Sequence, residues 1–520
     1  MTTPDFQPLH IGLHAAARPN RTAVVMADGS ARLDYAALDR RSRRLAVHLR
    51  RQGLGRGDHI AVLMRNNVDY FSVCWAAQRC GLYFTPVNWH LAPDEVAYIV
   101  KDCGAKALIV SPTELEVAAT FAHRLPQLSI RLVGGAAQGG FDSLDAILDD
   151  PASDGATLDE IEGQPMFYSS GTTGRPKGIK RPAAAAPWGS PGMGDQLAAR
   201  LHGIDAGAVL LSLAPLYHAA PLSWAMAALR YGGEVVVMPK FKPAEALTAI
   251  AQHHVTHAQF VPTMFVRLLE LPEAERRRHD LASLRMVVHA AAPCPIEVKQ
   301  RMLDWFGPIV HEYYAGSENN GLCAAGPQDW MSHPGTVGRA LFGQVRVLDE
   351  AEDELPAGEI GALYFSGTPR FEYHNDPQKT QRAFSKQGWS TLGDFGHIDE
   401  DGFVYLADRR TDLIISGGVN IYPRETEEAL MGHPAVHDAA VVGAPSAEFG
   451  EDVLAVVELR DGVAPSTALA QELIDFCRTR IAHFKCPRRV EFGILPRTPT
   501  GKLLRRVVKE QWRTAPAATV

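Results

Sequence analysis

The chain has 520 residues, of which 46% are hydrophobic and 21% charged, and its formal net charge is −7. A chain of this length exceeds what one hydrophobic core usually serves, so two or more domains are expected. The acidic balance argues against a general nucleic-acid binder, which needs a basic face to displace counterions from phosphates. Seven cysteines without a Cys-x-x-Cys pair indicate reduced thiols in a cytoplasmic compartment.

Two segments bear on membranes and export. Residues 1–20 lack a charged start followed by an apolar run, so no secretory signal is expected. Residues 208–229 contain no Asp, Glu, Lys or Arg, and their length alone would permit a membrane-spanning helix. Pro215 and Pro221 interrupt the stretch, however, and Tyr217 and His218 would lie near the middle of the bilayer. The sequence therefore predicts a buried strand, a loop and a buried helix, and no transmembrane segment.

Short apolar runs alternate with helical patterns along the first two-thirds of the chain. Strands are expected at 59–65, 107–111, 208–215, 234–239, 257–262 and 285–291, and helices between them include 66–80 and 244–254. Near-continuous apolar strands that alternate with helices are typical of doubly wound parallel sheets, so an α/β fold is predicted. Between about 335 and 407 the strands become short and are broken by Gly and Pro, which favours an antiparallel or distorted barrel portion.

The pattern starts afresh after residue 408. The expected order is a strand at 413–415, a helix at 424–431, strands at 436–443 and 453–459, a helix at 468–482 and a strand at 489–494. Such an α+β unit of roughly 110 residues is large enough to fold alone. The predicted domains are therefore residues 1–408 and residues 409–520, with the boundary between Asp408 and Asp412.

The stretch FYSSGTTGRPKGI at 167–179 crowds Gly, Ser and Thr after an apolar strand. Backbone N–H groups and hydroxyls in such a loop suit an anion, and Lys177 adds a point charge for phosphate. The spacing does not fit G-x-x-x-x-G-K-[ST], so the loop is not that of the P-loop NTPases. A plain surface loop is the alternative for a Gly/Ser run.

The order S-S-G-T-T-G-x-P-K-G resembles the signature loop of the adenylate-forming superfamily, which includes acyl- and aryl-CoA ligases, carrier-protein adenylation domains and firefly-type luciferases. Further segments resemble that family's motifs in the same order. They are PLYHAAP (215–221), HAAAPCP (289–295), YYAGSEN (313–319), TLGDFGHIDEDGFVYLADRRTD (391–412), SGGVNIYPRETEE (416–428) and PRTPTGKLLRR (496–506). The resemblance covers residues 10 to 510 approximately and is to the acyl-CoA synthetase, or fatty-acid–CoA ligase, type. It implies a large ATP- and acyl-binding domain followed by a small mobile domain that carries the catalytic lysine.

The resemblance assigns one set of residues to ATP and magnesium. Thr172, Thr173 and Lys177 would cover the β- and γ-phosphates, and Tyr314 would stack on adenine. Asp394, assisted by Arg409, would accept hydrogen bonds from the ribose hydroxyls, and Glu318 with Thr172 would hold Mg²⁺. The full ATP-binding set is Ser169, Ser170, Gly171, Thr172, Thr173, Gly174, Lys177, Ala291, Ala292, Pro293, Tyr314, Ser317, Asp394 and Arg409.

A second set is assigned to catalysis, the acyl group and coenzyme A. The catalytic residues are Lys502, Glu318 and His218; Lys502 would bridge the substrate carboxylate and the α-phosphate, so its distance from them controls the reaction. The acyl pocket would include His218, Ala219, Trp224, Gly316 and Gly321, with His218 as a gate to the thiol channel or, alternatively, a buried core histidine. The coenzyme A loop would be Ser416, Gly417 and Gly418, and Thr411 would be the hinge for domain alternation.

Three positions depart from the family pattern. Ser317 replaces the usual Thr, which keeps the hydroxyl. Ala315-Gly316 transposes the usual glycine placement, and Thr411 is a neutral hinge where an Asp or Lys is usual. The first should preserve function, the second changes the local backbone geometry, and the third removes an electrostatic bias from the domain rotation.

The expected function is ATP-dependent ligation of a carboxylic acid to coenzyme A through an acyl-AMP, with ATP, Mg²⁺ and coenzyme A as cofactors. The acid is expected to be a medium- or long-chain fatty acid or another bulky apolar acid, because the candidate pocket residues near the motifs are treated as small or apolar: Ala219, Ala220, Trp224, Met226 and residues 320–326. Alternatives are an aromatic or alicyclic acid, a separate carrier protein as acceptor, a luciferase-like oxidation, and a non-catalytic nucleotide- or acyl-binding module. A homo-oligomer and a lysine acetyltransferase acting on Lys502 are left open as partners.

Overall fold

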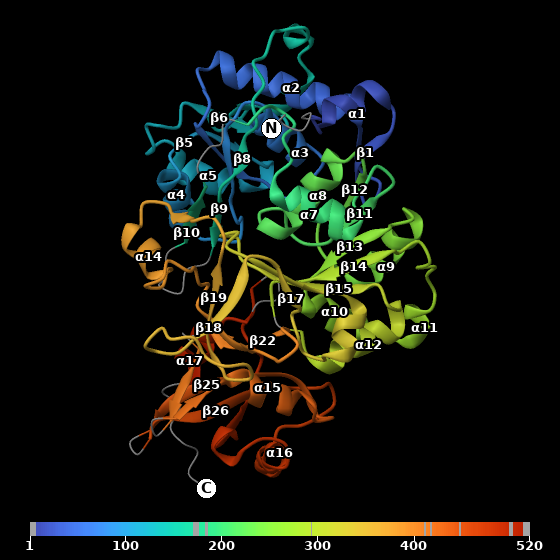
Figure 1. Ribbon diagram of the computed structural model, residues 1–520. Helices are drawn as coiled ribbons and strands as arrows, with labels where there is room; N and C mark the ends of the chain where they lie inside the picture. The colour runs from blue at the N-terminus through green and yellow to red at the C-terminus, as the bar shows by residue number, and fades with distance from the viewer. Residues whose placement is uncertain are drawn as a thin grey trace. The chain divides into compact units, whose positions relative to one another are not determined.

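The computed structural model describes residues 7–169, 176–181, 186–292, 294–409, 412–416, 419–446, 449–498 and 503–512, without the side chains of 408, 409, 419, 420 and 450. The chain divides into two compact units. Figure 1 labels their helices and strands. The first unit comprises residues 1–260, 267–289 and 371–381, and the second comprises 261–266, 290–370 and 382–520.

Parallel strands dominate the first unit. Six neighbouring strands follow the order β14-β13-β11-β12-β1-β2, and all but the β1–β2 pair are parallel. A second sheet has the order β7-β6-β5-β3-β4-β8 and is parallel throughout. The bounds are β1 Thr22–Met26, β2 Arg32–Asp34, β11 Val209–Ser212, β12 Glu234–Val237, β13 His257–Phe260, β14 Met286–His289, β3 His59–Leu63, β4 Tyr83–Pro86, β5 Ala105–Val110, β6 Ile130–Val133, β7 Asp142–Ser143 and β8 Gln164–Pro165.

The helices connect these strands, as parallel pairing requires, because a chain must cross over to start the next parallel strand from the same end. Their bounds are α1 Ile11–Ala17, α2 Tyr35–Arg51, α3 Asp69–Arg79, α4 Pro93–Asp102, α5 Leu115–Ala122, α6 Leu144–Asp149, α7 Met193–His202, α8 Ala219–Arg230, α9 Pro243–Gln252, α10 Pro262–Leu269 and α11 Glu273–Arg276. The prediction for residues 208–229 is confirmed: β11 and α8 are separate buried elements. No helix in the described part of the chain is long and apolar enough to span a bilayer.

A small antiparallel sheet also belongs to the first unit. Its order is β20-β10-β9, with β9 at Phe167–Ser169, β10 at Lys177–Lys180 and β20 at Glu372–Tyr373. The strands β9 and β10 form a hairpin in which Lys177 lies opposite Ser169 and Gly178 lies opposite Tyr168. The sheet thus positions both ends of the Gly-, Ser- and Thr-rich segment.

Antiparallel strands dominate the second unit, as predicted for residues 335–407. Strands β15, β16 and β17 pair in sequence, and a four-stranded sheet has the order β18-β19-β21-β22. Cys323, Val347, Leu363, Phe365 and Val404 form a core between these strands. The bounds are β15 Val310–Ala315, β16 Leu322–Ala325, β17 Arg339–Phe342, β18 Gln344–Leu348, β19 Gly361–Ser366, β21 Asp394–Ile398 and β22 Val404–Arg409, with helices α12 Ile296–Phe306 and α13 Pro327–Ser332. The helix α14, Pro377–Arg382, belongs to the first unit except for its last residue.

The described residues from 414 to 512 form a five-stranded sheet with helices packed on it (Figure 1). Its path is β24-β23-β26-β25, and β27 pairs with β26 in parallel. The predicted elements are confirmed, except that the helix expected at 468–482 ends at Arg478 and a 3₁₀ turn follows at His483–Lys485. The bounds are β23 Ile414–Ser416, β24 Val419–Ile421, β25 Val436–Ser446, β26 Gly450–Leu459, β27 Arg489–Phe492, α15 Pro423–Met431, α16 Thr467–Arg478 and α17 Arg505–Trp512.

Candidate functional site

The hairpin β9–β10 carries the expected phosphate-binding residues. Ser170, Gly171, Thr172, Thr173 and Gly174 lie outside the described residues, but Ser169 and Lys177 are partly buried and paired across the hairpin. The Lys177 ammonium lies 5.6 Å from the centre of the Tyr373 ring, a cation–π distance. The lysine is therefore held beside the aromatic ring of β20 at the end of the Ser- and Thr-rich segment.

Tyr314 and Asp394 are brought together by neighbouring parts of the second unit. The Tyr314 hydroxyl donates to Asp394 Oδ2 at 2.7 Å. Asp394 is only 7% exposed, and in the β21–β22 pairing it lies opposite Arg409. A carboxylate has several acceptor positions on two oxygens, so Asp394 can keep this bond and still accept from two adjacent hydroxyls.

The strand that presents Tyr314 is anchored by a buried ion pair. Lys299 Nζ, on α12, lies 2.6 Å from Glu312 Oε2, on β15, and the lysine side chain is fully buried. The same ammonium lies 5.0 Å from the centre of the Trp330 ring. Burial raises the pKa of Glu312 above its ordinary value, although the facing lysine opposes this. The pair fixes β15 against α12, two residues before Tyr314.

Glu318 follows β15 in the loop 316–321, together with Ser317. A Cβ on Gly316 would lie 2.8 Å from Glu318 Oε2 and 2.6 Å from a Leu392 methyl carbon, so a larger residue here would have to displace the ends of both side chains. Both Ser317 and Glu318 are partly exposed. One accessible carboxylate suits Mg²⁺, which keeps water and phosphate oxygens as its other ligands. Among the described residues, no cluster of three His, Cys, Asp or Glu could hold a metal alone.

The segment after β14 carries Ala291 and Ala292, while Pro293 lies outside the described residues. Ala291 has φ +74°, in the left-handed region that residues other than glycine rarely adopt. Such backbone strain persists only where the surroundings enforce it, often at functional sites. Cys294, three residues after Ala291, is buried, and burial raises the pKa of its thiol. A thiol in this state is a weak nucleophile, and none of the expected catalytic roles falls on Cys294.

The expected acyl residues of the first unit lie at the start of α8. His218 is the N-cap and Ala219 the first residue of the helix. Tyr217 and His218 contact each other with ring centroids 4.4 Å apart. Trp224 is 8% exposed, and its ring lies 4.8 Å from that of His202 on α7. This end of α8 is apolar and aromatic, with a histidine at its tip.

Gly321 and its neighbour Asn320 lie in the second unit. A Cβ on Gly321 would fall 2.0 Å from the Phe365 ring, so the ring packs directly on the backbone. Asn320 is fully buried, and neither its amide nitrogen nor its amide oxygen has a hydrogen-bond partner among the described residues. A buried unpaired amide costs roughly 1–3 kcal/mol, so a polar partner from outside the chain would be strongly favoured here. Sequence reasoning grouped residue 320 with small and apolar positions and missed this.

The C-terminal residues are only partly described. Ser416 ends β23 and lies opposite Val419 and Gly450. Gly417, Gly418, Thr411 and Lys502 lie outside the described residues, as does the side chain of Arg409. The structure therefore gives the backbone on either side of the expected coenzyme A loop and hinge, and their roles remain predictions.

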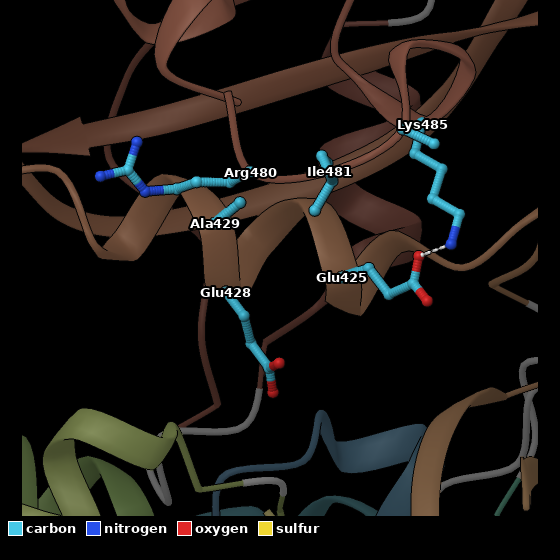
Figure 2. A pocket seen from close by; sticks show the side chains of 7 residues that line it. Glu425, Glu428, Ala429, Arg480, Ile481 and Lys485 are labelled. Carbon is cyan, nitrogen blue, oxygen red and sulfur yellow. Dashed lines mark ion pairs between the residues drawn. The ribbon is translucent and has the colours of Figure 1, made fainter. Parts of the chain in front are cut away.

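A pocket in this part of the chain contains none of the expected site residues (Figure 2). It lies against α15 and is lined by Glu425, Glu428, Ala429, Arg480, Ile481, Ala482 and Lys485. Its charges are engaged locally: Lys485 pairs with Glu425, and Glu428 accepts from Arg424 at 2.8 Å. The Arg480 guanidinium lies 3.4 Å from the centre of the Phe476 ring. The pocket is therefore separate from the residues that the sequence assigns to ATP, the acid and coenzyme A.

The structure brings together Tyr314 with Asp394, Ser169 with Lys177, and Gly316 with Glu318. Ser169, Lys177, His218, Ala219 and Trp224 belong to the first unit. Ala291, Ala292, Tyr314, Gly316, Ser317, Glu318, Gly321, Asp394, Arg409 and Ser416 belong to the second. The Lys299–Glu312 anchor was missed because lysine and glutamate 13 residues apart give no local sequence signal.

Known proteins resemble the chain over nearly its whole length. A family model described as AMP-binding enzyme matches residues 13–371, and the AMP-binding enzyme C-terminal domain matches residues 425–502. A feruloyl-CoA synthase of an Amycolatopsis species is 34% identical over 501 residues, covering 95% of this chain and 97% of that protein. The long-chain-fatty-acid–CoA ligase FadD13 of Mycobacterium tuberculosis is 30% identical over 514 residues, covering 96% and 97%. ATP-bound MatB from Rhodopseudomonas palustris has the same fold with a TM-score of 0.82 at 28% identity, covering 97% and 99%.

Proposed function

The chain belongs to the AMP-binding enzyme family, as an adenylate-forming enzyme of the acyl-CoA synthetase type, and on this premise we propose that it joins a bulky, largely apolar carboxylic acid to coenzyme A. The acid first attacks the α-phosphorus of ATP, which gives an acyl-AMP and pyrophosphate. The coenzyme A thiol then displaces AMP and forms the thioester. ATP, Mg²⁺ and coenzyme A are the cofactors of this reaction.

The observation that carries the proposal is the partly buried hydrogen bond from Tyr314 to Asp394. The two residues match the family's adenine and ribose positions, and the bond fixes one relative to the other. Glu318 supplies the carboxylate for Mg²⁺, and Lys177 adds positive charge near the phosphates. These groups offset the repulsion between a carboxylate and ATP, which is the main electrostatic barrier to the first step.

Lys502 is proposed as the catalytic lysine, in a domain formed by residues 409–520 that rotates between the two half-reactions. Its ammonium would bridge the acid and the α-phosphate during adenylation and withdraw before the thiol enters along Ser416, Gly417 and Gly418. Acetylation of Lys502 would remove its charge and two of its three N–H donors, and so would stop adenylation. The enzyme is proposed to be cytoplasmic, in line with seven buried, unbridged cysteines.

Two observations bear on the acid. The start of α8 is apolar, with Trp224 and Met226 both at least nine-tenths buried, which supports a bulky apolar skeleton. Asn320 favours a second candidate class, an aromatic or alicyclic acid with a hydroxyl or keto group, because such a group would satisfy its buried amide. A plain fatty acid would leave that amide unpaired.

The test is AMP release from ATP and Mg²⁺ with a panel of fatty, aromatic and hydroxylated or keto-substituted alicyclic acids, with and without coenzyme A. Turnover that requires one acid class and coenzyme A is the expected result. Acid-dependent adenylate formation that coenzyme A does not accelerate would favour a carrier-protein acceptor. ATP binding without any acid-dependent reaction would overturn the ligase proposal in favour of a non-catalytic binding module. Mass measurement of the purified protein would decide whether it forms a homo-oligomer.

A further inference from the structure

Tyr168 links the strand that enters the Ser- and Thr-rich segment to the end of a helix in the same unit. Its hydroxyl donates to Asp102 Oδ2 at 2.6 Å. We propose that Asp102 and Tyr168 are positioning residues for the β9–β10 hairpin and thereby control the affinity for ATP. The inference rests on the proposed function, because it assumes that Ser169 and Lys177 flank the phosphate-binding segment.

The hairpin needs such an anchor because its sheet is very small. The strand β9 has three residues, β10 has four and β20 has two. Short strands share few backbone hydrogen bonds, so their register and tilt are weakly specified by the ladder alone. Side-chain contacts to a rigid neighbour must then fix the hairpin.

Asp102 belongs to such a neighbour. It is the last residue of α4, a helix whose Val96, Ile99 and Val100 are buried in the core of the parallel sheet. A negative charge is unfavourable at a helix C-terminus because it faces the negative end of the helix dipole. The Asp102 carboxylate therefore does not stabilise α4 itself, but it can accept hydrogen bonds from the hairpin.

The same residue also holds the other side of the hairpin. Asn375 Nδ2 donates to Asp102 Oδ1 at 3.2 Å, and His374 Nε2 lies 2.9 Å from the Asp102 carbonyl oxygen. Both follow β20, which pairs with β10 through Tyr373 and Ile179. In addition, the His374 N–H donates to the Gly178 carbonyl at 2.8 Å. Asp102 thus connects the segments on both sides of β10 to one helix end.

The ring of Tyr168 reaches Asp102 by crossing Gly178. A Cβ on Gly178 would lie 2.9 Å from Tyr168 Cζ, 3.0 Å from its hydroxyl oxygen and 2.5 Å from the Met166 methyl carbon. A side chain at position 178 would therefore displace the Tyr168 ring. This gives the glycine after Lys177 a physical role: it leaves room for the tyrosine that holds the hairpin.

The position of the hairpin matters because Lys177 and the backbone at Ser169 would bind phosphate only when they lie at the right distance from it. Lys177 lies directly beside Gly178, and Ser169 directly follows Tyr168. If the hairpin tilts, donors that should meet the phosphates move together, and binding in both ground and transition states weakens. Neither Asp102 nor Tyr168 needs to touch ATP for this effect.

The experiment compares ATP binding by the full-length wild type and Tyr168→Phe, measured by isothermal titration with Mg²⁺-ATP. Tyr168→Phe keeps the ring over Gly178 and removes only the hydroxyl. A roughly tenfold weaker binding of ATP is expected, together with a raised KM for ATP and an unchanged KM for the acid. Tyr405→Phe is the matched control, because it removes a Tyr–Asp hydrogen bond, to Asp399 Oδ2 at 3.1 Å, in a different sheet.

The Asp102 variants distinguish an effect on the position of the hairpin from a loss of folding stability. Asp102→Ala removes the bonds from both Tyr168 and Asn375, so it should weaken ATP binding at least as much as Tyr168→Phe. The double variant should be no worse than Asp102→Ala alone, because the Tyr168 bond is already absent there. Asp102→Asn keeps an acceptor oxygen and should restore most of the ATP affinity. Unfolding of each variant should begin at the same temperature as in the wild type.

Unchanged ATP affinity in Tyr168→Phe, additive losses in the double variant, or equal increases in both KM values would overturn the inference. Wild-type protein that binds no ATP would instead overturn the proposed function. The two failures are therefore distinguishable.

Discussion

The Tyr314 hydroxyl and the Asp394 carboxylate form a 2.7 Å hydrogen bond between residues that are 80 positions apart in the chain. The bond connects the strand β15 to the strand β21. The Lys299–Glu312 ion pair anchors β15, and β21 is paired with β22. This bond fixes an aromatic ring and a carboxylate relative to each other, and in the proposed function they would receive the base and the ribose of ATP.

Tyr314→Phe should raise the KM for ATP by roughly tenfold, because it keeps the ring and leaves Asp394 without one of its donors. Asp394→Asn should have a larger effect, since a neutral amide accepts more weakly from ribose hydroxyls. Steady-state kinetics at varied ATP concentration measures both. Tyr231→Phe, at a position with no expected role in the site, should leave the KM unchanged, and an equal rise in that control would contradict the assignment.

Lys502→Ala should abolish acyl-AMP formation while leaving thioester formation from supplied acyl-AMP largely intact, because only the first step needs the bridging ammonium. The two half-reactions are followed separately by pyrophosphate release and by thioester formation. An equal loss in both would contradict the role assigned to this lysine. Lys509→Ala, nearby in the sequence on α17, serves as the matched charge control.

Asn320→Leu should change substrate preference rather than overall activity. Burial of an apolar side chain in place of the unpaired amide should favour acids without a hydroxyl or keto group, and the preference between paired substrates should shift by roughly tenfold or more. The ratio of kcat/KM for matched acids, with and without the polar group, measures it. An unchanged ratio would mean that Asn320 is not satisfied by the substrate.

Gly321→Ala should destabilise the second unit by about 1–3 kcal/mol, because the new methyl group would overlap the Phe365 ring and force it to move. The urea midpoint of unfolding reports the change. Gly194→Ala is the matched control: this helical glycine has no heavy atom within 4 Å of the added Cβ. It should leave stability unchanged or raise it by up to about 1 kcal/mol. If the two variants behave alike, the close packing of Gly321 does not matter.

His59 should make stability depend on pH between about 6.5 and 4. Its burial, with smaller contributions from Lys180 and His374, lowers its pKa to about 4, although Asp58 opposes this. Across that interval the unfolded chain binds a proton that the folded chain does not, so the free energy of unfolding falls as pH falls, by up to about 1.4 kcal/mol per pH unit.

His59→Phe keeps a ring against Tyr83, at a centroid distance of 4.5 Å in the wild type, and cannot titrate. The unfolding free energy of the wild type minus that of the variant, measured from pH 7 to pH 4, should therefore fall toward low pH. A difference that does not vary with pH would show that His59 titrates normally in the folded protein.

The sequence alone was sufficient to predict the α/β class, the strands that coincide with strongly apolar runs, and the family. Those features depend on local patterns. Apolar runs such as 234–239 form strands that are covered on both faces, and the family motif at 167–179 is contiguous in the sequence. Element ends were less accurate, as in the helix expected to reach residue 482, because a helix end depends on what packs against its last turn.

Only the tertiary structure revealed which distant residues meet. Tyr168 and Asp102 are 66 positions apart, and nothing in either local pattern indicates that one ring crosses Gly178 to reach the other's carboxylate. The same is true of the burial of Asn320, which sequence reasoning placed among apolar neighbours. Local sequence fixes the backbone's short-range preferences, whereas contacts between distant side chains follow from how the sheets pack, and that packing is a property of the whole chain.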